Sequence, residues 1–319
     1  MTRHSDRHGR QASKPTDIPK RGLRDVALRV KDQIGDDNIS IVAAGIAFFG
    51  ILSIFPALAA LLTLYGLVAS PQDVTGQIQT VAGMLPPDVQ QIIQDQLQRV
   101  ASASGGALGF GAIVGLLAAL WSASKGMKAL VTGIDIAYDE REERGFVKRT
   151  LVVLGLTLGA IVFVIVALGV ITVVPAVVAA LGLPATVEWA VLLGRWPLLV
   201  VLVMLALAVV YRVAPDRDEP QWRWVTPGSA LAAVLWIVGS ILFSLYVRNF
   251  GSYNESYGAL AGVVMLLLWL YLSAFVVLLG AEVNCEMERQ TRHDTTQGHR
   301  KPMGQRDAHA ADTLGRTRR

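Results

Sequence analysis

Two acids flank the last long apolar segment of the chain and are the first candidates for chemistry. Glu255 precedes this segment and Glu282 follows it, and paired carboxylates can act as acid and base or carry an ion. One helix would place them about 40 Å apart, because 27 residues separate them. Glu282 would lie near a helix C-terminus, where negative charge is unfavourable. We therefore expect a cationic partner for Glu282, with Lys125 or Lys128 as first choices.

Histidine, cysteine and the common catalytic motifs give no support for an enzyme. The single cysteine, Cys285, cannot form an intrachain disulfide. The chain has no P-loop, GxSxG elbow or dinucleotide-binding fingerprint. No histidine pair has zinc-ligand spacing in a segment that is predicted to be folded. The five histidines all stand in the tails, at His4, His8, His293, His299 and His309. The sequence predicts no catalytic residue, no metal site and no cofactor.

Hydroxyl groups are the polar side chains in the middle of the apolar segments, which contain no charged residue at that depth. The absence of charged residues at mid-depth argues against an ion pump with a carboxylate in mid-membrane. A carrier of lipids or other amphiphiles could instead place its polar groups at the rims of the membrane. Ser53 differs from most hydroxyls because Pro56 follows it, and a proline kink can free backbone carbonyls. The substrate-path candidates are Ser53, Pro56, Lys125, Lys128, Glu282 and Asn284.

Long apolar segments must position these residues. The chain is 53% hydrophobic and 17% charged, whereas soluble domains carry about 25% charged residues. Six segments are long enough to span a membrane as helices, at residues 39–69, 105–124, 150–174, 192–211, 225–247 and 258–281. The sequence thus predicts an all-α, polytopic membrane protein with six transmembrane helices. We expect residues 25–290 to form the membrane domain, and residues 1–24 and 291–319 to be disordered cytoplasmic tails.

The positive charges predict the orientation of these segments. Of the 29 lysines and arginines, 26 lie in the two tails and in alternate loops, and 3 lie in the remaining loops. Cytoplasmic loops carry such an excess, so both termini are predicted to be cytoplasmic. The same distribution explains the net charge of +4 without a nucleic-acid partner, and the lipid bilayer is the expected partner instead.

Two loops have distinct patterns. The predicted outer loop, residues 70–104, holds apolar residues on one helical face. It could be an amphipathic helix on the membrane or bundle, or a lid over a cavity that opens outward. The mixed-charge segment DEREERGFVKR at residues 139–149 is interpreted as a solvated cytoplasmic loop.

Glycines four residues apart predict close helix packing. Small residues at this spacing let helix backbones approach, within the bundle or, as an alternative, in a homo-oligomer. The pairs are Gly105 and Gly109, Gly111 and Gly115, Gly155 and Gly159, and Gly258 and Gly262.

Three stretches of the sequence resemble a known family. These are AGIAFFGILSIFPAL (Ala44–Leu58), the segment Trp121–Tyr138, and SYGALAGVVMLLLWLYLSAFVVLLGAEVN (Ser256–Asn284). They resemble the first span, the second span with its following loop, and the last span of the YihY/BrkB family. The resemblance covers residues 25–290 and implies a protein of the bacterial cytoplasmic (inner) membrane. Members were formerly labelled ribonuclease BN, and one was described as a factor in resistance to serum killing.

The family resemblance supplies no catalytic residues, so the functional hypotheses rest on the apolar segments and their rims. The first is a transporter, exporter or lipid flippase-like carrier of unknown substrate. The alternative is a non-transporting envelope scaffold or an assembly or resistance factor, whose outer loop would bind a partner. Ribonuclease activity is not expected, because the sequence offers no metal-ligand cluster for it.

Overall fold

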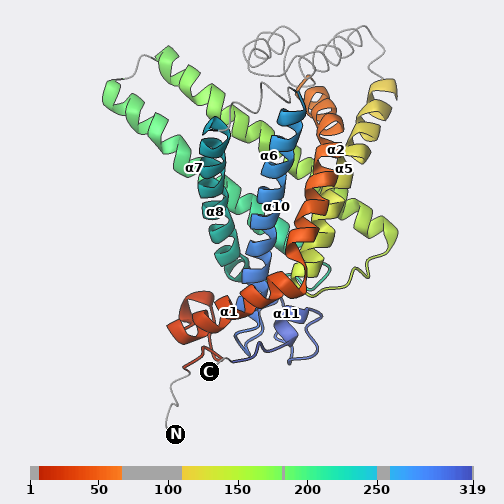
Figure 1. Cartoon of the computed structure of the whole chain (residues 1–319), viewed down its shortest axis with the longest axis vertical. Helices are drawn as coiled ribbons and strands as arrows, with labels where there is room; N and C mark the ends of the chain where they lie inside the picture. Colours follow the sequence, from red (N-terminus) through yellow and green to blue (C-terminus); the bar gives the residue numbers. More distant parts are fainter. Residues whose placement is uncertain (1–6, 67–109, 182–183, 250–258, 318–319) are drawn as a thin grey trace.

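The computed structural model describes residues 7–66, 110–181, 184–249 and 259–317, and these parts form a helical bundle (Figure 1). They contain no β-strand, only an isolated bridge between Pro220 and Thr296. The long helices are α2 (Ile39–Gly66), α5 (Phe110–Ala137), α6 (Phe146–Leu181), α7 (Ala185–Val213), α8 (Trp222–Asn249) and α10 (Ala259–Glu288). Shorter elements are η1 (Pro15–Asp17), α1 (Lys20–Asp36) and α11 (His309–Asp312). The all-α fold class is therefore confirmed. The predicted outer loop, residues 70–104, lies outside the described residues.

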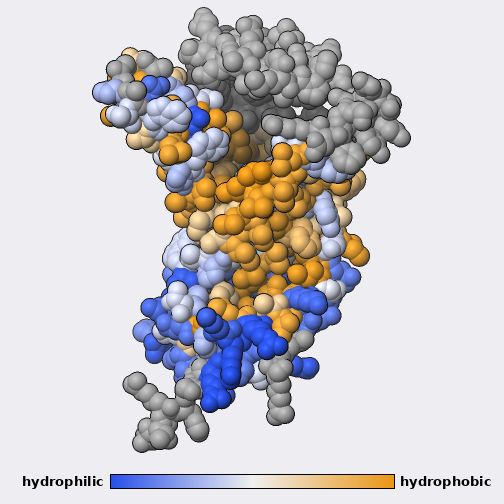
Figure 2. All heavy atoms as spheres, turned by 60° about the vertical axis from the view of Figure 1, so that its left-hand side comes forward, coloured by the Kyte–Doolittle hydropathy of each residue, from blue (hydrophilic) through white to orange (hydrophobic). Residues whose placement is uncertain are grey.

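Several helices are long and apolar enough to cross a membrane. The segments Phe146–Val178, Thr186–Val213, Trp222–Val247 and Gly262–Glu288 meet this criterion singly, and α1 with the first part of α2 can supply a fifth as a bent pair. Many of their large apolar side chains are exposed, including Val201, Ile241 and Leu242, and Figure 2 shows an apolar region across the middle of the face in view. Lipid can cover such a surface. The chain is a multi-pass membrane protein, and the count of six spans stays a prediction.

The helices run beyond the ends that the apolar pattern predicts. Helix α6 continues through Pro175 to Leu181, although we expected the segment to end before the proline. Helix α5 continues from residue 124 to Ala137, and this extension places Val131, Ile134 and Ala137 in the core. The marked bend of 62° lies between α1 and α2. There Asn38 takes a positive φ of 52°, a backbone state that asparagine tolerates at a helix C-terminus.

Helix α10 lies at the centre of the bundle. It packs against α1, α2, α5 and α8, while α5 also packs along α2, and α7 lies between α6 and α8 (Figure 1). The core includes Ile39 of α2, Ile134 of α5, Tyr211 of α7 and Leu278 of α10, each with none of its surface exposed. This core lies toward the end of the bundle that carries both chain termini.

The predicted glycine pairs do not form close contacts within the described bundle. A Cβ atom built on Gly115, Gly155, Gly159 or Gly262 would meet nothing within 4 Å, so a homo-oligomer contact at these positions stays a prediction. Gly105, Gly109 and Gly258 lie outside the described residues, and Gly111 belongs to α5. The closest helix approaches instead use Gly126, Gly228 and Gly280.

One end of the bundle is polar, and we call it the polar end. It comprises residues 7–38, the loops at 138–145 and 214–221, and the segment 289–317, which lie together at the bottom of Figure 1 and form the hydrophilic region of Figure 2. We expected disordered tails, but residues 7–24 and 291–317 are folded against the helices. Polar contacts hold them. These contacts include Arg306 with backbone carbonyls, which an apolar periodicity cannot reveal.

Candidate functional site at the polar end of the bundle

Ser53 forms a contact between two helices. Its Oγ donates to the carbonyl of Phe49 over 2.7 Å and accepts the backbone N–H of Gly126 on α5 over 2.9 Å. A Cβ on Gly126 would lie 3.3 Å from the Cα of Gly50, so α2 and α5 approach closely here. Ser53 thus joins α2 to α5, while Pro56 lies within α2, three residues further along.

A groove of about 440 Å³ runs between α2 and α5 on the outside of this contact. Its walls are mainly apolar, and Lys125 and Lys128 stand exposed in its lining. The predicted candidates Lys125 and Lys128 are therefore neighbours in one groove. The remaining lining residues are Val42, Gly45, Ile46, Phe49, Ala129, Thr132 and Gly133.

Asn284 fixes the crossing of α8 and α10. Its side-chain oxygen accepts the backbone N–H of Gly228 over 2.7 Å, and Asn284 is fully buried. A Cβ on Gly228 would collide with the carbonyl oxygen of Gly280 and with the Asn284 side chain. The predicted candidate Asn284 is therefore buried between helices.

Glu282 has different neighbours from those that the sequence suggests. It is 1% exposed, and neither carboxylate oxygen accepts a hydrogen bond from a described residue. The expected bond to Lys125 or Lys128 is therefore absent from the described structure. The polar group that faces Glu282 is the carboxyl of Asp37, from the corner between α1 and α2. Depth along a helix was predictable, whereas the rotation that turns Glu282 toward this corner was not.

A polar cleft of about 870 Å³ opens beside Asp37. Its walls come from the α1–α2 corner, the end of α5 with the following loop, the start of α6, the loop after α7, and the start of α11 with the residues before it. The lining residues are Asp37, Ile136, Asp139, Glu140, Arg141, Glu143, Arg144, Lys148, Asp216, Asp307 and His309. Sequence reasoning interpreted residues 139–149 as a solvated loop and missed the cleft. The density of alternating charges in that segment was the signal that could have indicated it.

Ion pairs and burial set the charges of the cleft. Arg144 binds Glu142 over 2.7 Å and lies 3.5 Å from Asp216. Burial raises the pKa of Glu140 to about 7, although the backbone N–H of His309 donates to it over 2.7 Å and partly opposes that change. Burial also raises the pKa of Asp37. Two carboxyl groups of the cleft therefore keep a proton to higher pH than ordinary surface acids do.

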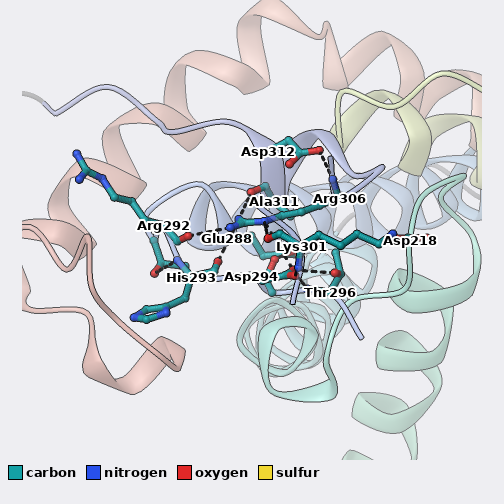
Figure 3. Close-up of polar contacts among 12 residues, drawn as sticks. Asp218, Glu288, Arg292, His293, Asp294, Thr296, Lys301, Arg306, Ala311 and Asp312 are labelled. Carbon is teal, nitrogen blue, oxygen red and sulfur yellow. Dashed lines mark hydrogen bonds and ion pairs between the residues drawn. The ribbon is translucent and has the colours of Figure 1, made fainter. Parts of the chain in front are cut away.

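A folded cap made by residues 289–317 closes the polar end beside the cleft. Arg217 binds both oxygens of Glu288, at 3.2 and 2.8 Å, and both side chains are fully buried. Thr295 donates to Glu288 over 2.6 Å. Figure 3 shows Arg306 directed at carbonyls of the same cap, together with the Lys301–Asp218 pair. The cap thus places Asp307 and His309 at the cleft.

Among the described residues, no group of three or more His, Cys, Asp or Glu side chains is placed to hold a metal ion. The cleft offers mixed charges and proton exchange, and the groove offers an apolar wall with two ammonium groups. Each of these two surfaces could receive a ligand.

Comparisons with known proteins agree with the apolar architecture. The family described as Virulence factor BrkB matches residues 30–304. The ribonuclease-like protein YfkH of Bacillus subtilis is 33% identical over 262 residues, which cover 78% of this chain and 90% of that protein. A UPF0761 membrane protein of Paraburkholderia xenovorans is 27% identical over 82% of this chain and 59% of its own length. A UPF0761 membrane protein of Tolumonas auensis is 40% identical over 30% of this chain and 31% of its own length.

No solved structure matches the chain. The family match extends from α1 into the cap, so it includes the groove and Glu282. It also includes the cleft except for Asp307 and His309. With its multi-pass helical bundle and this match over most of its length, the chain belongs to the BrkB virulence-factor family of membrane proteins.

Proposed function

We propose that the protein is a carrier that moves an anionic amphiphile, such as a phospholipid, across the cytoplasmic membrane. The groove between α2 and α5 is the observation that carries this proposal. Its apolar wall suits an acyl chain, and Lys125 and Lys128 suit a phosphate group. The groove would face the lipid bilayer, so an amphiphile could enter it laterally from the bilayer.

The absence of charged side chains in the middle of the apolar segments supports an amphiphile over a free ion. An ion that crosses a membrane needs polar partners at mid-depth, whereas a lipid carrier needs them mainly for the headgroup. Ser53 lies next to the groove residue Phe49 and joins the two helices that form the groove. A small change at this contact would alter the width of the groove.

Transport in liposomes tests the proposal. The purified protein would be reconstituted with fluorescently labelled phosphatidylglycerol or phosphatidylcholine, and exposure of each label to an impermeant quencher would be followed over time. We expect the anionic lipid to cross faster than in protein-free liposomes. The double variant Lys125→Gln and Lys128→Gln should slow this crossing by roughly tenfold, the equivalent of about 1.4 kcal/mol.

Lys148→Gln is the matched control. Lys148 is exposed and lines the polar cleft rather than the groove, so its variant should transport the anionic lipid at the wild-type rate. Equal rates for all proteins and for protein-free liposomes would reject the carrier. That result would favour a non-transporting envelope protein.

A further inference from the structure

Glu282 is a buried carboxyl group without a conventional partner. Its side chain projects from α10 into the core and is 1% exposed. Neither oxygen accepts an N–H or O–H group of a described residue. An ionised carboxylate in such a place would lack both water and hydrogen-bond donors, which costs several kcal/mol. The negative charge of Glu282 must therefore be neutralised, by a bound proton or by a cation.

The carboxyl group of Asp37 is placed to share a proton with Glu282. Its carboxyl lies within hydrogen-bonding reach of Glu282. Two ionised carboxylates only accept hydrogen bonds and repel one another. A hydrogen bond forms between them once one of the two carries a proton. Asp37 also lines the polar cleft, so it connects the buried acid to solvent.

The surrounding charges are already engaged with other groups. Arg29 of α1 pairs with Glu286, and Arg289 of α10 binds Glu286 over 2.7 Å and Asp139 over 3.4 Å. His309, the first residue of α11, lies 3.6 Å from Asp139.

The corner itself adds polar groups to this arrangement. Gln33 of α1 donates to Asp37 over 3.4 Å, and the exposed Asp36 adds negative charge beside it. Arg289 lies near enough to favour the ionised form of Asp37. In the hydrogen bond between the two carboxyl groups, Asp37 is therefore the acceptor and Glu282, which carries the proton, is the donor.

We propose that Glu282 and Asp37 form a proton-binding site, in which one proton on Glu282 is hydrogen-bonded to Asp37 and fastens α10 to the α1–α2 corner. On release, the proton passes from Glu282 to Asp37 and then to water in the cleft, and no other reactant is needed. The two carboxylates then carry two negative charges in contact. Their repulsion separates the corner from α10, so proton release changes how α1 and α2 sit against the bundle. This inference does not depend on what the protein transports.

Infrared spectroscopy of the purified full-length protein detects the proton directly. A carboxylic-acid C=O stretching band should be present in the wild type at neutral pH and disappear at high pH. Glu282→Gln should lack this band, and Asp37→Asn should retain the band at a shifted frequency. The matched control Asp36→Asn changes an exposed acid of the same corner and should keep the wild-type band. A spectrum with no band that depends on Glu282 would overturn the proposal.

Thermal unfolding in detergent provides the second measurement. Between about pH 6 and about pH 10, the apparent Tm of the wild type should fall by roughly 5 °C more than that of Glu282→Gln. Stability should be lost as pH rises, because loss of the shared proton leaves two carboxylates in contact. Parallel curves for the two proteins would contradict the shared proton. So would a rise in Tm with Na⁺, K⁺ or Mg²⁺ that Glu282→Gln abolishes, since the pair would then bind a metal ion. Should Glu282→Gln fail to fold, Asp37→Asn and the wild-type spectrum still decide the question.

Discussion

At the residue scale, the decisive positions are those where a small or polar side chain lets two helices meet. Gly228 and Gly280 bring α8 and α10 together, and Asn284 joins the same crossing through the backbone N–H of Gly228. Tyr211 adds a hydrogen bond of 2.7 Å to the carbonyl of Val277 from α7. Three helices are therefore fixed at one crossing beside the core.

Gly228→Ala should destabilise the protein strongly. The added methyl group would overlap the carbonyl oxygen of Gly280 and the Asn284 side chain, and overpacking typically costs about 1–3 kcal/mol. We expect a clear decrease in apparent Tm and in yield of monodisperse protein. Gly155→Ala is the control, because a Cβ there meets nothing within 4 Å. An equal decrease in both variants would show that the crossing is not close-packed.

The sequence singled out several polar residues as substrate-path candidates, a role that stays a prediction, and it could not assign their partners. Ser53 and Asn284 were predicted as candidates, and each forms a hydrogen bond between helices. Glu282 was expected to meet a lysine, yet Asp37 faces it. Helix periodicity gives the depth of a residue and its neighbours on the same helix. It does not give the rotation of one helix against another, which decides such pairs.

At the element scale, the apolar segments predicted where the long helices lie but not where they end. Apolarity ends near the membrane surface, whereas helical hydrogen bonding continues into residues such as those of α5 up to Ala137. The folded cap was missed for a related reason. Its contacts are buried ion pairs and arginine–carbonyl bonds, and these arise between segments that are far apart in the sequence.

Glu288→Gln should release the cap. Glu288 binds the buried Arg217 and accepts from Thr295 of the cap, and removing one partner of a buried ion pair costs about 3–5 kcal/mol. Trypsin should then cut within residues 289–306 many times faster than in the wild type, as followed by mass spectrometry. Glu219→Gln is the control, because Glu219 pairs with Arg212 at an exposed position, with 58% of its side chain accessible. Exposed pairs contribute about 1 kcal/mol or less. Cleavage of the two variants at one rate would refute a structural role for Glu288.

At the scale of the whole molecule, the distribution of positive charge agrees with the arrangement of the described bundle. The first and last described residues, 7 and 317, lie at the polar end, and the end of α6 and the start of α7 lie at the opposite end (Figure 1). The distribution of lysines and arginines predicted that both ends of the chain lie on one side of the membrane. Each additional span reverses the side, and these residues accumulate on one side. We predict that the polar end is the side that faces the cytoplasm.

Cysteine labelling can determine that side with little background. The single native cysteine, Cys285, is 1% exposed, so an impermeant maleimide should leave the wild type unlabelled. Thr186→Cys and Thr317→Cys place thiols at exposed positions at the opposite ends of the bundle. In intact spheroplasts we expect label at position 186 alone, and at position 317 only after permeabilisation. The reverse pattern would place the cleft and the cap outside the cell. Protons would then reach the Glu282–Asp37 pair from the external side. The same experiment therefore determines whether the pair responds to the pH of the cytoplasm or to the pH outside the cell.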